Sequence, residues 1–419
     1  MFNIFGKRKK VYNIAITGLS RSGKTIFLTS LIDNLINNSK FRHDLAYARA
    51  EEKEGSTFRW KENANKIKDK GEWPRGTEEI SDITIDLYDN NDKVQSTLNF
   101  MDYPGEWILD FRLLNQEKKM DYKTWSIEFT KVYKNREEMQ LFYEKLENTN
   151  LDSSQDASEL SKLYTEGLLK LRENHFYNLT PARFIMKDGS EDKEDFDFFP
   201  LHIDSSNKNN INFTKSELYK YCDKKYENYK KTYIKPNLKK FKNFDSQICF
   251  IDVLEMLHNG KDAHYDIQGV LRKIFDQYKY NSKLPFSKSI EKLALVGTKC
   301  DLFCEDQQEN YRDLLKEICS HLNITKMNNN KKDNIKEFII SSVVTTVPID
   351  KDKVSFERAD GAIKSGRFIL PVNINSANFK KTLKYPEMRT HPTTRKYGTY
   401  EALRSRNIED LLKFILEKR

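Results

Sequence analysis

The chain has 419 residues, of which 38% are hydrophobic and 32% charged, and this composition supports a folded core and excludes a wholly disordered chain. The formal net charge of +9 is compatible with a nucleotide, a nucleic acid or an anionic membrane surface as binding partner and does not distinguish between them. No apolar run reaches the roughly 18 residues of a membrane span, and the five cysteines show no CxxC pair, so we expect a cytoplasmic protein.

The first predicted element is a β-strand at residues 11–17, VYNIAIT, a short β-branched apolar run typical of a buried parallel strand. It leads into GLSRSGKT, residues 18–25, which matches the pattern GxxxxGK[ST]. In that pattern, loop N–H groups and the lysine bind phosphates and the last hydroxyl binds Mg²⁺. Apolar residues at helical spacing after the loop predict an amphipathic helix. The order of strand, loop and helix predicts phosphate binding by Gly18, Ser20, Arg21, Ser22, Gly23, Lys24 and Thr25.

Two antiparallel strands joined by an Asp/Asn turn are predicted over residues 81–105, and the second strand ends in DYPG. In switch GTPases a DxxG at this place holds Mg²⁺ through water with its aspartate and meets the γ phosphate with its glycine amide. Asp102 and Gly105 are the corresponding residues. Thr77 is a candidate Mg²⁺ ligand of switch I, although a turn or helix-cap role explains it equally well. The expected metal ligands are therefore Thr25, Thr77 and Asp102.

Another apolar strand, KLALVG at residues 292–297, is followed by TKCD. This fits the [NT]KxD element of GTPases, in which the aspartate accepts hydrogen bonds from guanine and the lysine stem covers the ring. Adenine presents the opposite pattern of hydrogen-bond donors and acceptors on this edge of the base. Thr298, Lys299 and Asp301 therefore favour guanine. Turns after exposed strands also contain Lys and Asp without any ligand. The order of the motifs is what favours a guanine site here.

Two further strands complete the predicted sheet. QICFIDVLEML, residues 247–257, supplies a central strand, and we interpret its Asp252 as a structural or pocket-edge carboxylate. KEFIISSVVTT, residues 336–346, supplies the next strand and places Ser342 where GTPases contact the guanine O6. A last amphipathic helix, with Asn407 as a possible N-cap, should pack against this sheet.

The region between the DxxG motif and the next core strand is far longer than in small GTPases, and its apolar residues recur three and four apart. We therefore expect a G domain in two parts, residues 1–107 and 246–419, with a mainly helical insertion at residues 108–245 that senses a partner or gates the nucleotide. Lysines and tyrosines alternate over residues 215–244, as in some nucleic-acid or membrane surfaces. The helical spacing of the aromatic residues favours instead a helix packed on the core.

GLSRSGKT, DYPGEW, TPARF, QICFIDVL and TKCD occur in this order along the chain. With these motifs the sequence resembles the YcjX-like family of bacterial P-loop GTPases over almost its whole length. The resemblance implies a Ras-like α/β P-loop fold, in which helices flank a mostly parallel sheet, with a large helical insertion. It also implies a cytosolic protein that binds and hydrolyses GTP and is linked to bacterial stress responses. The family tends to show an alanine- and arginine-bearing segment at the last base loop, where this chain has SSVVTT.

The expected reaction is Mg²⁺-dependent hydrolysis of GTP to GDP and phosphate, with Lys24 stabilising charge on the transferring phosphoryl group. Glu106 stands where many GTPases place a water-orienting glutamine, and a carboxylate there predicts slow turnover. Arg75 and Arg21 are candidates for a charge-stabilising arginine, although a solvated surface position is the commoner role of such residues.

Two alternatives remain open at this point. A P-loop ATPase or kinase predicts a preference for ATP, and a non-catalytic interaction protein held together by bound nucleotide predicts tight GDP retention without turnover. A protein effector or regulator is the expected macromolecular partner. Nucleic acid is not favoured, and nothing in the sequence supports contact with a membrane.

Overall fold

The computed structural model describes residues 9–19, 22–74, 80–114, 120–185, 197–201, 214–241, 244–258, 260–276, 290–320, 334–351, 353–357, 361–367, 370 and 402–417. The chain divides into two compact units. The first, here called the sheet unit, comprises Met1–Gly105, Asn243–Leu271 and Tyr278–Arg419. The second, here called the helical unit, comprises Glu106–Lys242 and Arg272–Gln277.

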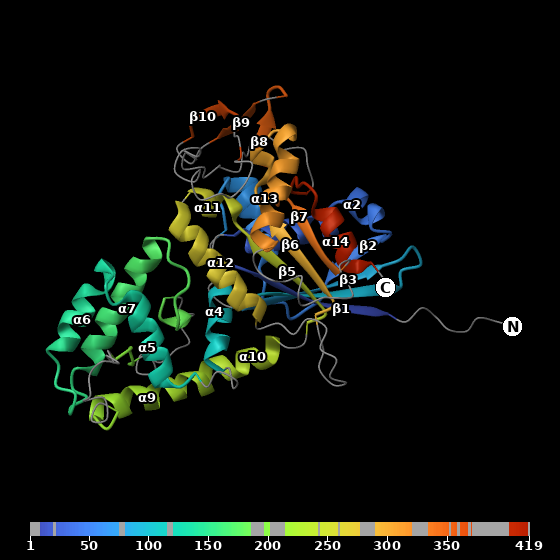
Figure 1. Ribbon diagram of the computed structural model, residues 1–419. Helices are drawn as coiled ribbons and strands as arrows, with labels where there is room; N and C mark the ends of the chain where they lie inside the picture. Colours follow the sequence, from blue (N-terminus) through green and yellow to red (C-terminus); the bar gives the residue numbers. More distant parts are fainter. Residues whose placement is uncertain are drawn as a thin grey trace. The chain divides into compact units, whose positions relative to one another are not determined.

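A seven-stranded, mostly parallel sheet is the centre of the sheet unit (Figure 1). Its strands are β1 (Lys10–Gly18), β2 (Arg49–Glu52), β3 (Ser81–Tyr88), β4 (Val94–Asp102), β5 (Ser246–Ile251), β6 (Lys292–Gly297) and β7 (Ile335–Ile339). Their order across the sheet is β2-β3-β4-β1-β5-β6-β7. The central strand β1 pairs in parallel with β4 and β5, and β3 pairs antiparallel with β2 and β4. The predicted α/β class and the predicted β3–β4 hairpin are confirmed.

Helices flank this sheet (Figure 1). They are α1 (Lys24–Asn37), α2 (Ser39–Asp44), α3 (Trp60–Asn65), α11 (Val253–His258), α12 (Gly260–Asp276), α13 (Gln308–Ser320) and α14 (Ile408–Leu416), with a π-helical turn, η1 (Lys66–Lys70), after α3. The end of α12, from Arg272, belongs to the helical unit. Phe27 and Leu31 of α1 are fully buried, as their helical spacing predicts. They share one hydrophobic cluster with Ile14 of β1 and Leu411 of α14. The predicted C-terminal helix therefore packs on the core of the sheet unit.

The strand predicted at residues 247–257 is shorter than expected. β5 ends at Ile251, and α11 begins at Val253. An apolar run alone does not distinguish a buried strand from a buried helix. Once strand pairing ends, the Leu, Glu and Met residues that follow favour a helix.

The strand predicted at residues 336–346 also ends early, at Ile339. The next residues form a loop, and Thr346 begins a separate three-stranded sheet of β8 (Thr346–Pro348), β9 (Val354–Glu357) and β10 (Ile363–Gly366). Asn407 stands at the N-cap position of α14, but its side chain makes no cap hydrogen bond. Its Nδ2 donates instead to the backbone oxygen of Ile339 at 2.8 Å.

The helical unit contains α4 (Gly105–Leu109), η2 (Asp110–Leu114), α5 (Tyr122–Tyr133), η3 (Glu137–Met139), α6 (Gln140–Glu147), α7 (Ala157–Glu173), η4 (Ala182–Phe184), α9 (Glu217–Tyr229), η6 (Lys230–Ile234) and α10 (Lys235–Phe241). Aromatic side chains fill its core. The ring of Trp125 stacks on Tyr226 with centroids 5.3 Å apart and meets Tyr164 edge-on at 6.5 Å. Such ring pairs stabilise beyond the area that they bury.

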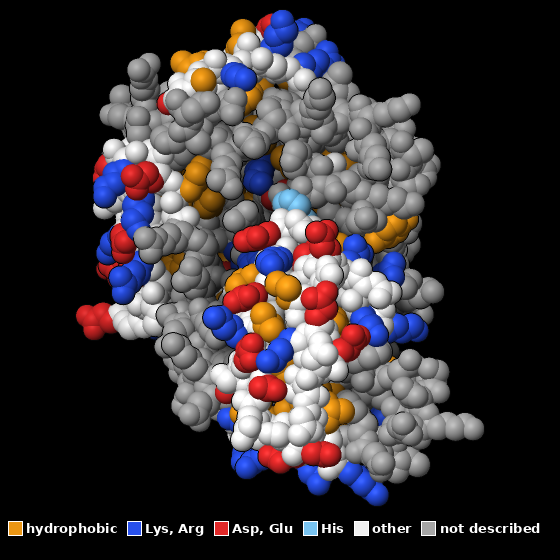
Figure 2. Space-filling view, turned by 90° about the vertical axis from the view of Figure 1, so that its left-hand side faces the viewer, with side chains coloured by type: hydrophobic (Ala, Val, Ile, Leu, Met, Phe, Trp, Pro, Cys, Tyr) orange, Lys and Arg blue, Asp and Glu red, His pale blue; other side chains and the backbone are white. Residues whose placement is uncertain are grey.

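The tyrosine stripe predicted over residues 215–244 lies on α9 and η6. Cys222, Tyr226 and Tyr229 are fully buried, so this segment packs its aromatic side chains on the core of the helical unit. On the face shown in Figure 2, Lys and Arg side chains are interspersed with Asp and Glu side chains. Mixed charges of this kind are typical of a solvated surface, whereas a nucleic-acid footprint is a basic patch.

Two features bear on the environment of the chain. Within the described residues, no helix is both long and apolar enough to cross a membrane. All five cysteines are buried free thiols.

Candidate functional site

Two glycines shape the loop between β1 and α1. Gly18 has φ 137° and Gly23 has φ 95°, a backbone region that residues with a Cβ rarely adopt. A Cβ on Gly18 would lie 2.6 Å from the backbone oxygen of Phe250 on β5. The loop therefore passes closer to the neighbouring strand than a side chain permits. This close approach and the glycine conformations are what a phosphate-binding loop requires.

Lys24, the first residue of α1, folds back into this loop. Only 6% of the residue is exposed. Its Nζ donates to the backbone oxygens of Gly18 at 2.8 Å and Leu19 at 2.9 Å. Both acceptors are neutral carbonyls, and no carboxylate of the described residues forms an ion pair with Lys24. A nearly buried ammonium group without an anionic partner is costly, so the loop is suited to take up an anion.

Ser22 stabilises the shape of the loop. Its Oγ donates to the backbone oxygen of Leu19 at 2.7 Å, and its N–H donates to the same oxygen at 3.2 Å. The two bonds close the turn that precedes α1. Ser20 and Arg21, the other two predicted residues of the loop, lie outside the described residues.

The predicted metal ligands Thr25 and Asp102 lie beside each other. Strand pairing places Asp102, the last residue of β4, opposite Ile16 of β1. The distance between Thr25 Oγ1 and Asp102 Oδ2 is 3.4 Å. Hydroxyl and carboxylate oxygens are the hard ligands that Mg²⁺ prefers, so this pair fits a magnesium site. Thr77 and Arg75 lie outside the described residues.

Gly105 brings the DxxG motif against the phosphate loop. A Cβ on Gly105 would lie 1.8 Å from the backbone oxygen of Gly18, so only glycine fits. The N–H of Tyr103 donates to the backbone oxygen of Ile16 at 3.2 Å, which extends the pairing of β1 and β4 into the motif. The two motifs that the sequence assigns to phosphates therefore meet within the sheet unit.

TKCD follows β6, next to the end of β5. Lys299 has a left-handed backbone conformation, φ 65°, and its Nζ donates to Asp252 Oδ2 at 2.7 Å. Asp252 directly follows β5, and its ion pair with Lys299 fixes the direction of the lysine side chain. Thr298 is 3% exposed, and its backbone oxygen accepts from the Tyr311 hydroxyl at 2.6 Å. The motif is held from both neighbouring elements, β5 and α13.

Asp301 is held by the loop that follows β7. Ser341 Oγ donates to Asp301 Oδ1 at 2.7 Å. Thr345 donates to Asp301 Oδ2 from its N–H at 2.8 Å and from its hydroxyl at 3.0 Å. Ser342 directly follows Ser341, so the structure brings this predicted residue to the TKCD motif. The sequence analysis placed Ser341, Ser342 and Val343 near the guanine O6 but did not predict that Ser341 and Thr345 hold Asp301, for which the hydroxyl-rich run SSVVTT was the available signal.

Glu106 belongs to the helical unit. Its Oε1 lies 3.4 Å from Nη2 of Arg172 on α7, and 6% of the glutamate is exposed. The next residue, Trp107, packs under the guanidinium group of Arg183 from the TPARF motif, which lies 3.5 Å from the ring centroid. The sequence analysis did not predict either arginine as a partner, because both contacts join residues far apart in the chain.

A buried carboxyl group lies in the same unit. Asp110 accepts a hydrogen bond from the Ala182 N–H at 2.9 Å and another from the Tyr229 hydroxyl at 2.6 Å. Burial raises the pKa of Asp110 to about 7, although these hydrogen bonds and the charge of Arg183 act in the opposite direction. The donors join η2, η4 and α9, so this carboxyl group links three segments of the helical unit.

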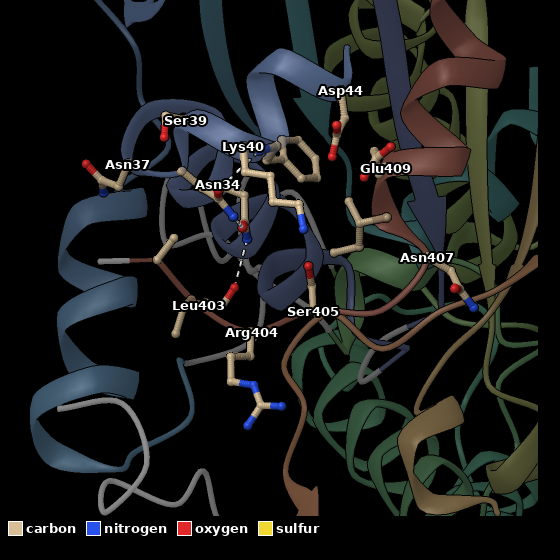
Figure 3. A pocket seen from close by; sticks show the side chains of 14 residues that line it. Asn34, Asn37, Ser39, Lys40, Asp44, Leu403, Arg404, Ser405, Asn407 and Glu409 are labelled. Atoms are coloured by element: carbon tan, nitrogen blue, oxygen red, sulfur yellow. Dashed lines mark hydrogen bonds between the residues drawn. The ribbon is translucent and has the colours of Figure 1, made fainter. Parts of the chain in front are cut away.

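A pocket of about 460 Å³ lies elsewhere in the sheet unit. It is lined by the C-terminal end of α1, by α2 and by residues 402–409, and by none of the predicted site residues. Figure 3 shows Asn34 of α1 hydrogen-bonded to Leu403. At about 1.5 Å of rise per residue, Asn34 lies roughly 15 Å along α1 from Lys24. The pocket is therefore separate from the phosphate loop.

A mostly parallel sheet with a phosphate loop after β1, DxxG after β4 and TKCD after β6 defines a Ras-like P-loop fold. The model of the YcjX-like family, DUF463, matches residues 12–419, and the chain belongs to this family. The chain is 27% identical over 347 residues to the Ras-like GTPase YcjX of Escherichia coli (strain K12), covering 73% of this chain and 72% of that protein. It is 25% identical over 350 residues to the Ras-like GTPase YcjX of Shewanella oneidensis, covering 74% and 72%.

Proposed function

We propose that this chain binds GTP and GDP and hydrolyses GTP to GDP and phosphate. The observation that carries the proposal is the nearly buried ammonium group of Lys24, whose hydrogen bonds within the described part of the chain go to the carbonyls of Gly18 and Leu19. A phosphate group supplies the anion that this lysine requires, and the loop N–H groups and the N-terminus of α1 bind the same anion. Two relatives are named GTPases, which supports the same nucleotide class.

Guanine is the proposed base. The carboxylate of Asp301 accepts from the two donors on the guanine edge, which adenine does not present in that arrangement. The stem of Lys299, directed by Asp252, covers the ring. Thr298 and the loop at Ser342 complete the proposed base pocket.

For hydrolysis, Thr25 and Asp102 would hold Mg²⁺, with Thr77 as the further ligand that the sequence predicts. The ion neutralises charge on the phosphates when it is bound. Lys24, the loop N–H groups and the Gly105 amide stabilise the charge that develops on the transferring phosphoryl group. This use of fixed donors needs no covalent intermediate on the protein.

Slow turnover is part of the proposal. Glu106 replaces the amide side chain that many GTPases use to orient water, and a carboxylate cannot donate as an amide does. The ion pair with Arg172 also occupies the carboxylate of Glu106. Arg75 and Arg21 are the proposed charge-stabilising candidates. We extend the proposal to a Mg²⁺-dependent molecular switch in the bacterial stress response, with a protein effector or regulator contacted through the helical insertion, residues 108–245.

The test is a titration of the purified protein with fluorescent GTP and ATP analogues in Mg²⁺, alongside phosphate release. Lys24→Ala should lose affinity for both nucleotides. Asp301→Asn should lose guanine selectivity and gain affinity for xanthine nucleotides, because xanthine carries an oxygen where guanine carries its amine. ATP binding as tight as GTP binding and indifferent to Asp301→Asn would overturn the guanine proposal in favour of an ATPase or kinase. GDP retained without any turnover would favour a non-catalytic interaction protein.

A further inference from the structure

The carboxylate of Asp301 is already engaged by the loop after β7. Ser341 Oγ occupies one side of Oδ1 at 2.7 Å and shares its single proton with the backbone oxygen of Val343 at 2.9 Å, and Thr345 supplies two hydrogen bonds to Oδ2, at 2.8 and 3.0 Å. A carboxylate offers about four acceptor positions, so about one position is left. Guanine presents two donors, N1–H and the exocyclic amine, on the edge that a carboxylate reads. One of the loop's hydrogen bonds must therefore be released before Asp301 reads both donors.

Burial leads to the same requirement. Asp301 is 2% exposed and Thr345 is 5% exposed. The Thr346 hydroxyl also donates to the backbone oxygen of Asp301 at 2.6 Å, so the loop is attached to both the side chain and the main chain of this residue. A base that contacts the carboxylate has to take the place of one of these groups.

Residues 402–406, here called the strap, hold the backbone of this loop. The N–H of Val344 donates to the backbone oxygen of Arg404 at 2.8 Å. Ser341 and Arg406 exchange two backbone hydrogen bonds, at 3.2 and 2.8 Å. Three backbone bonds thus keep the loop beside Asp301.

The strap is in turn anchored on α1. The N–H of Leu403 donates to Asp33 Oδ2 at 2.6 Å. Asn34 Nδ2 donates to the backbone oxygen of Leu403 at 2.9 Å, as Figure 3 shows. Asp33 is fully buried, and its other oxygen accepts from Lys68 at 2.7 Å and from Asn37 at 2.9 Å. A buried carboxylate with three donors, one of them a lysine, is a firm anchor, because these hydrogen bonds offset the cost of burying its charge.

We propose that Thr345 caps the Asp301 carboxylate and sets the affinity of the site for guanine, by giving up its hydroxyl bond when the base binds. The inference rests on the proposed function, since it takes Asp301 as the group that reads guanine. The strap holds the loop backbone in place, whereas a hydroxyl group is released by rotation about one side-chain bond. The bond that the side chain loses is subtracted from the binding energy of the base.

The test compares Thr345→Val, which keeps the shape and removes the hydroxyl, with Thr345→Ser, which keeps the donor. Both are titrated with fluorescent GTP and with inosine triphosphate, which lacks the exocyclic amine and needs one acceptor fewer. Thr345→Val should bind GTP roughly tenfold more tightly than the wild type, as expected for loss of one competing bond to a charged group. The gain for inosine triphosphate should be smaller, and Thr345→Ser should bind both nucleotides like the wild type.

The possible failures are distinguishable. Equal GTP affinity in the wild type and in Thr345→Val, with guanine selectivity that still collapses in Asp301→Asn, would overturn the cap and leave the proposed function intact. A wild type without guanine selectivity would overturn both. Circular dichroism melting checks the fold of each variant. Thr345→Ala, which also lacks the hydroxyl, must also bind GTP more tightly than the wild type. Unchanged GTP affinity in both Thr345→Val and Thr345→Ala rules the cap out.

Discussion

The sheet unit and the helical unit have cores of different chemistry. The cluster of the sheet unit is mainly aliphatic, and Ile14, Leu31 and Leu411 are among its fully buried members. The large buried side chains of the helical unit are aromatic, with Trp125 and Tyr164 at the centre. Aliphatic side chains on strands and helices form the layered core of an α/β sheet, whereas in the helical unit aromatic rings fill the space between helices.

Buried polar groups also differ between the units. In the sheet unit, Lys24, Asp102 and Asp301 are nearly buried and cluster where strands end and loops begin. In the helical unit, Asp110 is surrounded by donors from its own core. Ligand sites of α/β sheets lie at the carboxyl ends of strands. The buried polar groups of the sheet unit therefore lie where the fold allows a ligand to bind, whereas Asp110 joins structural segments of the helical unit.

The largest expected effect is that of Gly105→Ala. The added Cβ would lie 1.8 Å from the backbone oxygen of Gly18, and backbone cannot move aside as a flexible side chain does. We expect a loss of about 4 kcal/mol or more in unfolding free energy, together with loss of nucleotide binding, measured by denaturant unfolding and titration. Gly55→Ala is the control, since its φ is 90° but nothing lies within 4 Å of its Cβ. It should cost about 1–2 kcal/mol, and an equal cost at both positions would contradict the clash.

Trp125→Ala tests the independence of the two cores. Trp125 is 1% exposed, and removal of such a side chain costs about 3–5 kcal/mol. The helical unit should melt at lower temperature, while GTP affinity of the folded protein changes little, because the phosphate loop and TKCD lie in the sheet unit. Differential scanning calorimetry and titration measure the two quantities. A parallel loss of affinity would mean that the two cores act as one cooperative unit.

The third prediction concerns pH. Because the folded-state pKa of Asp110 is raised from 3.8 to about 7, this group contributes stability at acid pH that is lost as the pH rises from 3.8 to about 7. The loss amounts to at most ~4 kcal/mol. Asp110→Asn removes the titrating group, so its melting temperature should fall less than that of the wild type over this range.

Melting curves at several pH values provide the measurement for Asp110→Asn. Asp152→Asn, at an exposed position, is the matched control and should follow the wild type. Parallel pH profiles for Asp110→Asn and the wild type would show that Asp110 does not titrate in this range.

The smallest expected effect is that of Thr298→Val. Within the described residues, Thr298 Oγ1 is buried and has no hydrogen-bond partner. Replacing it with a methyl group should therefore raise the stability of the nucleotide-free protein by about 1 kcal/mol, measured by thermal melting. Thr346→Val is the matched control with the opposite sign, since its hydroxyl donates to the backbone oxygen of Asp301 at 2.6 Å. Destabilisation by both substitutions would show that the Thr298 hydroxyl already has a partner.

The order of strand, loop and helix around Lys24 was predictable because glycine positions, apolar runs and helical spacing are local in sequence. The same holds for the hairpin that ends at Asp102. The limits of β5 were not predictable, since periodicity does not distinguish Leu254–Leu257 in a strand from the same residues in a helix. The edge strand β2, with sequence RAEE, lacks an apolar pattern because edge strands carry charged side chains.

The partners of the site residues were the least predictable part. Thr345 holds Asp301 across 44 positions of the chain, and Arg172 meets Glu106 across 66. Hydroxyl groups and arginines are common on surfaces, so no local pattern marks these particular ones. Their role depends on which strands are neighbours in the sheet and on how helices pack, and both follow from the tertiary fold.

The anchor of the strap has a consequence for biosynthesis. Leu403 and Asp33 are 370 positions apart, and the Tyr12 hydroxyl bonds to Leu416 across 404. Contacts at such separation form late, because closing a long loop is entropically costly and the chain leaves the ribosome from its N-terminus. A nascent chain therefore holds the residues for phosphate long before it holds those that keep the base loop in place. We therefore expect newly made protein to select among bases only after residues 402–406 have left the ribosome and hold the base loop.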